Sequence, residues 1–177
     1  MCGYQLTQTA KRGAKLIVVD PRKIDIAEKA DHWVQLRPGT DDALALGMLH
    51  VIIQEGLYDK EFVKKWTLGF DELAERVKQF SPERMGEITW VPAETIRAVA
   101  RTYATTKPAC IQWGVGVDQN INSSQTIRAI LLLSGLTGNI DVPGGDAFWV
   151  PPANVVLQSA RLNPGIMLPG KLTPEMR

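Results

Sequence analysis

The sequence predicts an α/β fold, a three-layer sandwich in which helices cover a parallel sheet, with extra helices and an irregular C-terminal segment. Three features of the 177-residue chain predict it. Apolar runs of strand length alternate with segments of helical period, the first run is as unbroken as a strand buried on both faces, and polar or glycine-containing loops follow the runs. At about 150 residues per domain, the length fits one domain with an appendage.

The first forty residues predict two strands separated by helical turns. Residues 15–20 form an apolar run that Pro21 stops, and residues 32–36 have the aromatic and β-branched side chains typical of strands. Short helical segments are expected at 7–13 and 24–30. We expect both strands to belong to one parallel sheet.

The longest helix is predicted over residues 41–55. Thr40 suits its N-cap, and Asp41 and Asp42 fall in the first turn, where the helix dipole favours negative charge. Apolar side chains recur every three or four residues along it, so one wide face should be buried. Gly56 ends it.

Beyond this helix the pattern predicts further helices and a third strand. The helices are expected at 59–66, 70–79, 92–105 and 123–136, the last capped by Asn122 or Ser123, and the strand at 108–114. The helical stretch from 41 to 105 is interpreted as an insertion or a helical layer.

Composition excludes several classes of partner. Lys plus Arg (20) nearly balances Asp plus Glu (19), so we expect no nucleic-acid partner and no charged membrane surface. The apolar run at 130–133 is far too short to cross a bilayer, so no membrane insertion is expected. The first ten residues lack the basic and apolar regions of a secretory signal, and localisation stays open.

No residue set predicts catalysis or metal binding. His32 and His50 are interpreted as structural, and Cys110 as a small buried side chain. Cys2 and Cys110 alone cannot form a disulfide framework or hold an iron–sulfur cluster. No metal-ligand spacing or GxSxG sequence is present, so we name no catalytic residue and no metal ligand.

Three loops at the ends of the predicted strands are candidate ligand-binding sites, because ligands bind there in open α/β sheets. The candidates are Asp20, Pro21 and Arg22 after the first strand, Pro38, Gly39, Thr40 and Asp41 after the second, and Gly114, Gly116 and Gln119 after the third. The first and second loops also fit a solvated turn and a helix-capping loop. The third imitates a dinucleotide fingerprint, with Gln119 in place of its last glycine.

Asp41 carries the most specific of these hypotheses. A carboxylate at the start of a helix can accept hydrogen bonds from N1–H and the N2 amine of guanine, and adenine offers no such pair. The alternative is that Asp41 only complements the helix dipole.

Several segments, taken in order, carry a family resemblance. They are 15–22 (KLIVVDPR), 30–31 (AD), 36–46 (LRPGTDDALAL), 52–59 (IIQEGLYD) with Phe62, 93–96 (AETI), 113–116 (WGVG), 136–140 (LTGNI) and 143–145 (PGG). Together they resemble the molybdopterin oxidoreductase family, the group of dimethyl sulfoxide reductase and formate dehydrogenase. The likeness covers about residues 10–146.

The resemblance implies a Rossmann-like cofactor-binding domain over 1–146, within a large catalytic subunit that holds molybdenum or tungsten between two molybdopterin guanine dinucleotides. It implies that Asp20, Pro21, Arg22 and the Gly39-Thr40-Asp41 loop hold guanosine and phosphates of one dinucleotide, with the 114–119 region near the cofactor.

The family's cysteine cluster, metal-ligand segment and C-terminal cofactor domain do not occur in this sequence. We therefore expect a fragment of a longer catalytic subunit, without turnover or cofactor of its own. Its implied partners are the remaining domains and an electron-transfer subunit. Two other functions stay open, an independent NAD- or nucleotide-binding domain and a non-catalytic interaction module.

Residues 147–177 are rich in proline and glycine and are expected to be an extended tail or a connection to a further domain. Deleting them should leave the 1–146 fold largely intact, because proline density prevents regular hydrogen bonding. Circular dichroism and thermal unfolding of both chains check this. A cooperative loss of the fold on deletion would contradict it.

Overall fold

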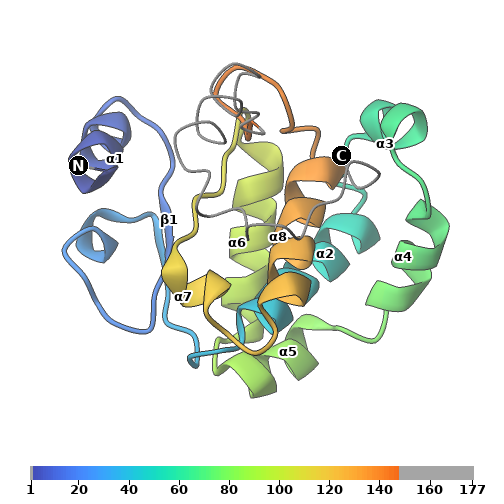
Figure 1. The fold of residues 1–177 in the computed structure, drawn as a ribbon, viewed down its shortest axis with the longest axis horizontal. Coiled ribbons are helices and arrows are strands. Elements are labelled where there is room, and N and C mark those ends of the chain that lie inside the picture. The colour runs from blue at the N-terminus through green and yellow to red at the C-terminus, as the bar shows by residue number, and fades with distance from the viewer. Residues whose placement is uncertain (1, 148–177) are drawn as a thin grey trace, which may run out of the picture. The chain divides into compact units, whose positions relative to one another are not determined.

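A small parallel sheet and a group of helices around α2 make up the part of the chain that the structure, a computed structural model, describes (Figure 1). That part is residues 2–147. In chain order the elements are α1 (Cys2–Lys11), β1 (Ile17–Val19), the 3-10 helix η1 (Ala27–Lys29), β2 (His32–Val34), α2 (Asp41–Gln54), α3 (Lys60–Trp66), α4 (Phe70–Val77), α5 (Pro82–Thr89), α6 (Ala93–Thr105), α7 (Val115–Asp118) and α8 (Ser123–Leu136).

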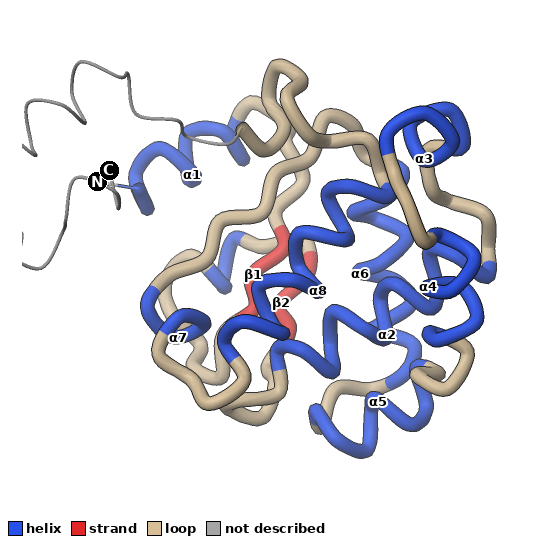
Figure 2. The backbone as a smooth tube through the Cα atoms, turned by 45° about the vertical axis from the view of Figure 1, so that its right-hand side comes forward, coloured by secondary structure: helices blue, strands red, loops and turns tan. Residues whose placement is uncertain are grey.

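The two strands lie side by side and parallel, as Figure 2 shows in red. Ile17 pairs with His32 and Val19 with Val34, and the Asp20 N–H extends the ladder to the Val34 carbonyl at 3.2 Å. The predicted class, α/β with a parallel sheet and extra helices, is confirmed. Parallel pairing brings the carboxyl ends of both strands, and therefore the loops after them, to one edge.

The core is built around α2. Leu49 and Ile52 are fully buried in it, and α5, α6 and α8 all pack against it. Gly47 allows one of these contacts, because a Cβ there would stand 3.2 Å from side-chain atoms of Ile96 and Met85. The wide apolar face that the sequence predicts for this helix is therefore buried on several sides.

The predicted third strand at 108–114 is wrong. The segment is extended, but within residues 2–147 it pairs with neither strand. Its N–H groups bond to side chains instead, Ala109 to Asn139 Oδ1 at 3.1 Å and Ile111 to Asp146 Oδ1 at 2.9 Å. Strand-like sequence thus yields an extended chain held by side-chain oxygens.

Cys110, expected to be buried, is exposed. Successive side chains of an extended segment point to opposite sides. Ala109 and Ile111 pack against the core, so Cys110 between them points away from it.

Two helices were not predicted. α5 begins as sequence rules allow, with Pro82 in its first turn and the Ser81 hydroxyl accepting the Arg84 N–H at 3.4 Å. α7 is a single turn within the expected polar loop. α1 also begins earlier than expected, at Cys2. The predicted tail lies, apart from Ala147, outside the described residues.

A polar network after α8 holds the extended segment in place. Asn139, 1% exposed, donates from Nδ2 to Thr137 Oγ1 at 2.8 Å, and its carbonyl accepts the Asp146 N–H at 2.7 Å. The Asp146 carboxylate in turn accepts the Ser134 hydroxyl. Gly145 is required here, because a Cβ would stand 2.3 Å from the Asn139 carbonyl oxygen.

We predict that Asn139→Ala lowers the free energy of unfolding by about 1–3 kcal/mol, because the Ala109 N–H loses its acceptor in a partly buried place. Chemical denaturation measures the change. The exposed neighbour Gln112, replaced by alanine, serves as the control and should stay within about 0.5 kcal/mol of the unmodified chain. Equal effects of the two substitutions would contradict the assigned role of Asn139.

Candidate functional site

The loop after β1 is a fixed turn at the strand-end edge. The Asp20 carboxylate accepts the Arg22 N–H at 2.7 Å, and Trp33 Nε1 donates to the Asp20 carbonyl at 3.0 Å. Gln35 donates to the Pro21 carbonyl at 3.0 Å, so the ends of both strands are tied together. The Arg22 side chain is 83% exposed. The turn therefore holds its backbone in place. The Arg22 guanidinium lies 4.0 Å from Asp20 Oδ1 through its Nε and is still open to solvent, where it can meet an anion.

A shallow surface hollow adjoins this turn. Arg22, Lys23, Ile24, Asp25 and Ile26 line it. Of these, Arg22 and Lys23 carry positive charge and Asp25 carries negative charge. The two cations are groups that can bind a phosphate.

The loop after β2 turns sharply into α2. Gly39 has a φ of 79°, a conformation that favours glycine. The Thr40 hydroxyl donates to the Arg37 carbonyl at 2.7 Å and makes no capping bond to the helix, so its predicted capping role is wrong. The hydroxyl is used to close the turn, and the first N–H groups of α2 gain nothing from it.

Asp41 is the first residue of α2 and is half-buried. Burial raises the pKa of its carboxyl, its backbone hydrogen bond lowers the pKa, and the neighbouring charge of Asp42 raises it again. Asp42 is engaged differently, because its Oδ1 accepts the Ala43 N–H at 2.8 Å. Of the two carboxylates, Asp41 is therefore the one whose charged form loses hydration through burial.

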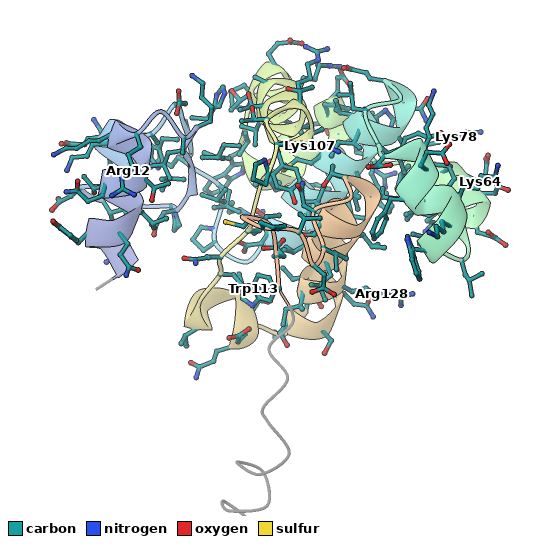
Figure 3. The ribbon with its side chains drawn as sticks, turned by 90° about the horizontal axis from the view of Figure 1, so that it is seen from above. Arg12, Lys64, Lys78, Lys107, Trp113 and Arg128 are labelled. Atoms are coloured by element: carbon teal, nitrogen blue, oxygen red, sulfur yellow. The ribbon has the colours of Figure 1, made fainter. Side chains whose placement is uncertain are left out.

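The third predicted loop begins at α7. Gly114 precedes this helix, Gly116 lies within it, and Gln119 follows it, all three exposed. Trp113, labelled in Figure 3, donates from Nε1 to Asp118 Oδ1 at 3.2 Å. That bond ties the end of the extended segment to the helix.

The structure brings the second and third loops together through a residue that was not predicted. Asn120 Nδ2 lies 3.9 Å from where a Cβ of Gly39 would stand. Its Oδ1 accepts the Asn122 N–H at 3.1 Å, which fixes the amide. Only the polar composition of 118–125 signalled it, and sequence gave no reason to choose Asn120.

The two histidines form hydrogen bonds that connect parts of the fold. His32 shares a hydrogen bond with Thr102 Oγ1 at 2.9 Å, and His50 with the Val77 carbonyl at 2.8 Å. Residues 2–147 contain no group of three or more His, Cys, Asp or Glu that could hold a metal ion. Over the same residues, no helix has the length and hydropathy to span a membrane.

The loops at the carboxyl ends of parallel strands are where open α/β sheets bind ligands. Comparison with known protein families makes the class specific. The family described as Molybdopterin oxidoreductase matches residues 2–165, and the chain belongs to this family. Membership implies a molybdopterin cofactor with molybdenum or tungsten.

Curated relatives agree with this assignment. The chain is 47% identical over 151 residues to acetylene hydratase of Syntrophotalea acetylenica, covering 85% of this chain and 20% of that protein. It is 48% identical over 135 residues to formate dehydrogenase H of Escherichia coli, covering 76% of this chain and 19% of that protein. The solved acetylene hydratase of Pelobacter acetylenicus superposes with a TM-score of 0.74 at 50% identity, covering 75% of this chain and 18% of that structure.

The chain thus spans about a fifth of the length of these relatives. One relative is named a hydratase and another a dehydrogenase. The segment that this chain matches is therefore shared by proteins whose named activities differ.

We predict that Asp41→Asn raises the melting temperature at pH 7. Because burial raises the pKa of Asp41, its ionised form is less favourable in the folded than in the unfolded chain. Below about pH 4 the carboxyl is protonated in both states, so the gain should disappear there. Thermal unfolding of both chains across this pH range measures it.

Asp42→Asn is the matched control and should give no gain, because Asp42 already accepts a hydrogen bond from the helix. A lower melting temperature of Asp41→Asn at pH 7 would show instead that Asp41 acts only as a complement to the helix dipole.

Proposed function

We propose that this domain binds the guanosine and phosphate end of one molybdopterin guanine dinucleotide in a molybdenum- or tungsten-dependent enzyme of which it is a part. The observation that carries the proposal is the half-buried Asp41 carboxylate at the start of α2, beside the Gly39 turn. Family membership favours this proposal over an independent NAD-binding domain or an interaction module.

The donors and acceptors at the strand-end edge fit such a ligand. Guanine presents N1–H and the N2 amine as adjacent donors, and the carboxylate of half-buried Asp41 can accept from both. Phosphates require cations and N–H donors. The side chains of Arg22 and Lys23 offer the cations. At the start of α2, Thr40 caps no N–H group, while the Ala43 N–H is taken by Asp42 Oδ1.

Each loop has its own role in the proposal. Asp41 would recognise the base, Gly39 would let the ligand approach the backbone, and Arg22 would meet a phosphate. Asp20 would hold the Arg22 turn through the 2.7 Å bond to its N–H and accept from a ribose hydroxyl with its other oxygen. Gly114, Gly116 and Gln119 would border the cofactor, because Asn120, which follows them, lies near Gly39.

When bound, the molybdopterin cofactor supplies the metal centre at which the substrate reacts. The residues of this chain orient and retain one end of that cofactor. We propose that turnover requires the remainder of the longer protein, because the chain spans only about a fifth of its relatives.

We predict that Asp41→Ala in the full-length enzyme weakens cofactor retention about tenfold to a hundredfold. The loss of a charge-assisted bidentate pair costs roughly 1–3 kcal/mol. Asp42→Ala, one position further round the helix, should have little effect on retention. Cofactor content after purification and the melting temperature of both variants measure the outcome. Full occupancy in Asp41→Ala with only a lowered melting temperature would overturn the guanine assignment.

A further inference from the structure

Trp90 occupies a position that its backbone and its surroundings both disfavour. It ends α5, with its N–H on the Gly86 carbonyl at 2.9 Å, and has a φ of 65°. Glycine is the usual residue at such a left-handed helix end, because a Cβ is strained there. The residue is 69% exposed, so burial does not compensate for the strain.

The contact that the structure gives this indole is with Arg37. The guanidinium carbon of Arg37 lies 5.6 Å from the ring centroid. The backbone supports the pair, because the Arg37 N–H donates to the carbonyl of fully buried Thr89 at 2.8 Å. An exposed aromatic ring at the end of α5 thus has a cation over it.

This pair adjoins the proposed cofactor loop. Arg37 directly precedes Pro38, and its carbonyl accepts the Thr40 hydroxyl that closes the turn before Asp41. Figure 1 shows α5 beside the start of α2, at the lower end of the molecule. The bond from Arg37 to Thr89 fixes this proximity, since it joins the turn to the residue before Trp90.

We propose that Trp90, supported by Arg37, is a stacking surface for the purine ring whose edge Asp41 recognises. The inference rests on the proposed function and adds a specific contact to it. Indole and guanidinium groups are planar, and both stack on nucleobases. Contact with the ligand then explains why a strained, exposed tryptophan lies against Arg37, the residue whose carbonyl closes the turn before Asp41.

Stacking and edge recognition differ in what they distinguish. Every base has a π face, so stacking tolerates guanine and adenine alike. A carboxylate that accepts from N1–H and the N2 amine selects guanine. Replacing Trp90 should therefore weaken the binding of both purines equally, and replacing Asp41 should weaken the binding of guanine alone.

Binding of GMP and of AMP to the 177-residue chain, measured by NMR titration of the indole N–H signals and backbone amides, tests this. Trp90→Gly should weaken both nucleotides about tenfold. It should also raise the melting temperature, because glycine suits the left-handed φ, and this shows that the lost binding is not lost folding. Asp41→Ala should weaken GMP and leave AMP unchanged.

Trp66→Ala is the matched control. Trp66 also ends a helix, is 67% exposed and has the Lys65 ammonium 5.1 Å from its ring centroid, but it lies on α3. This variant should bind both nucleotides as the unmodified chain does.

The outcomes separate the inference from the proposed function. Unchanged affinities in Trp90→Gly, with GMP weakened in Asp41→Ala, overturn the stacking surface and leave the proposed function standing. Equal weakening by Trp66→Ala and Trp90→Gly also overturns the stacking surface. GMP binding unaffected by Asp41→Ala, or no binding of either nucleotide at millimolar concentrations, overturns the proposed function itself.

Discussion

The apolar length of α2 is the constraint on which the rest of the structure depends. Ala43, Leu44 and Ala45 are buried in its first turns, and Val51 and Ile52 in its last. No side of such a helix can face water along its whole length, so α5, α6 and α8 must surround it. Its first residue, Asp41, follows β2 after the loop 35–40. The requirement to bury one helix therefore also places the carboxylate of the candidate site.

In the 108–114 segment, side chains form hydrogen bonds of the kind that a neighbouring strand forms in a sheet. Asn139 and Asp146 accept the N–H groups of Ala109 and Ile111, which a neighbouring strand would otherwise bond. Buried backbone groups must find partners, and in this part of the chain the loop after α8 supplies them. The extended segment ends at Trp113, which is bonded to α7. The bonds that hold the 108–114 segment therefore also position α7 and the loop after it, in which Asn120 lies near Gly39.

The sequence pattern predicted the elements whose formation depends on residues close together in the chain. The two strands and α2 follow from apolar runs, and the turn at Gly39 follows from its Pro-Gly sequence. The prediction of a strand at 108–114 was wrong because a strand must pair with a neighbouring strand, and the residues of the segment itself do not show whether one is present. Asn120 and Trp90 were missed for the same reason, since their placement depends on contacts with Gly39 and Arg37 across the fold. The loops of the candidate site were predictable, and the contacts between them were not.

The two-stranded sheet has a consequence for handling the protein. Within residues 2–147, β1 pairs on one side only, with β2. A strand with an open edge is a template for another strand, and charged neighbours or a covering segment normally block it. Lys15 and Asp20 flank β1, but Val19 within it is 42% exposed. The three-residue length of β1 limits such pairing, so edge-to-edge contact in concentrated samples would centre on Val19, and a charged residue there is the natural solubilising substitution.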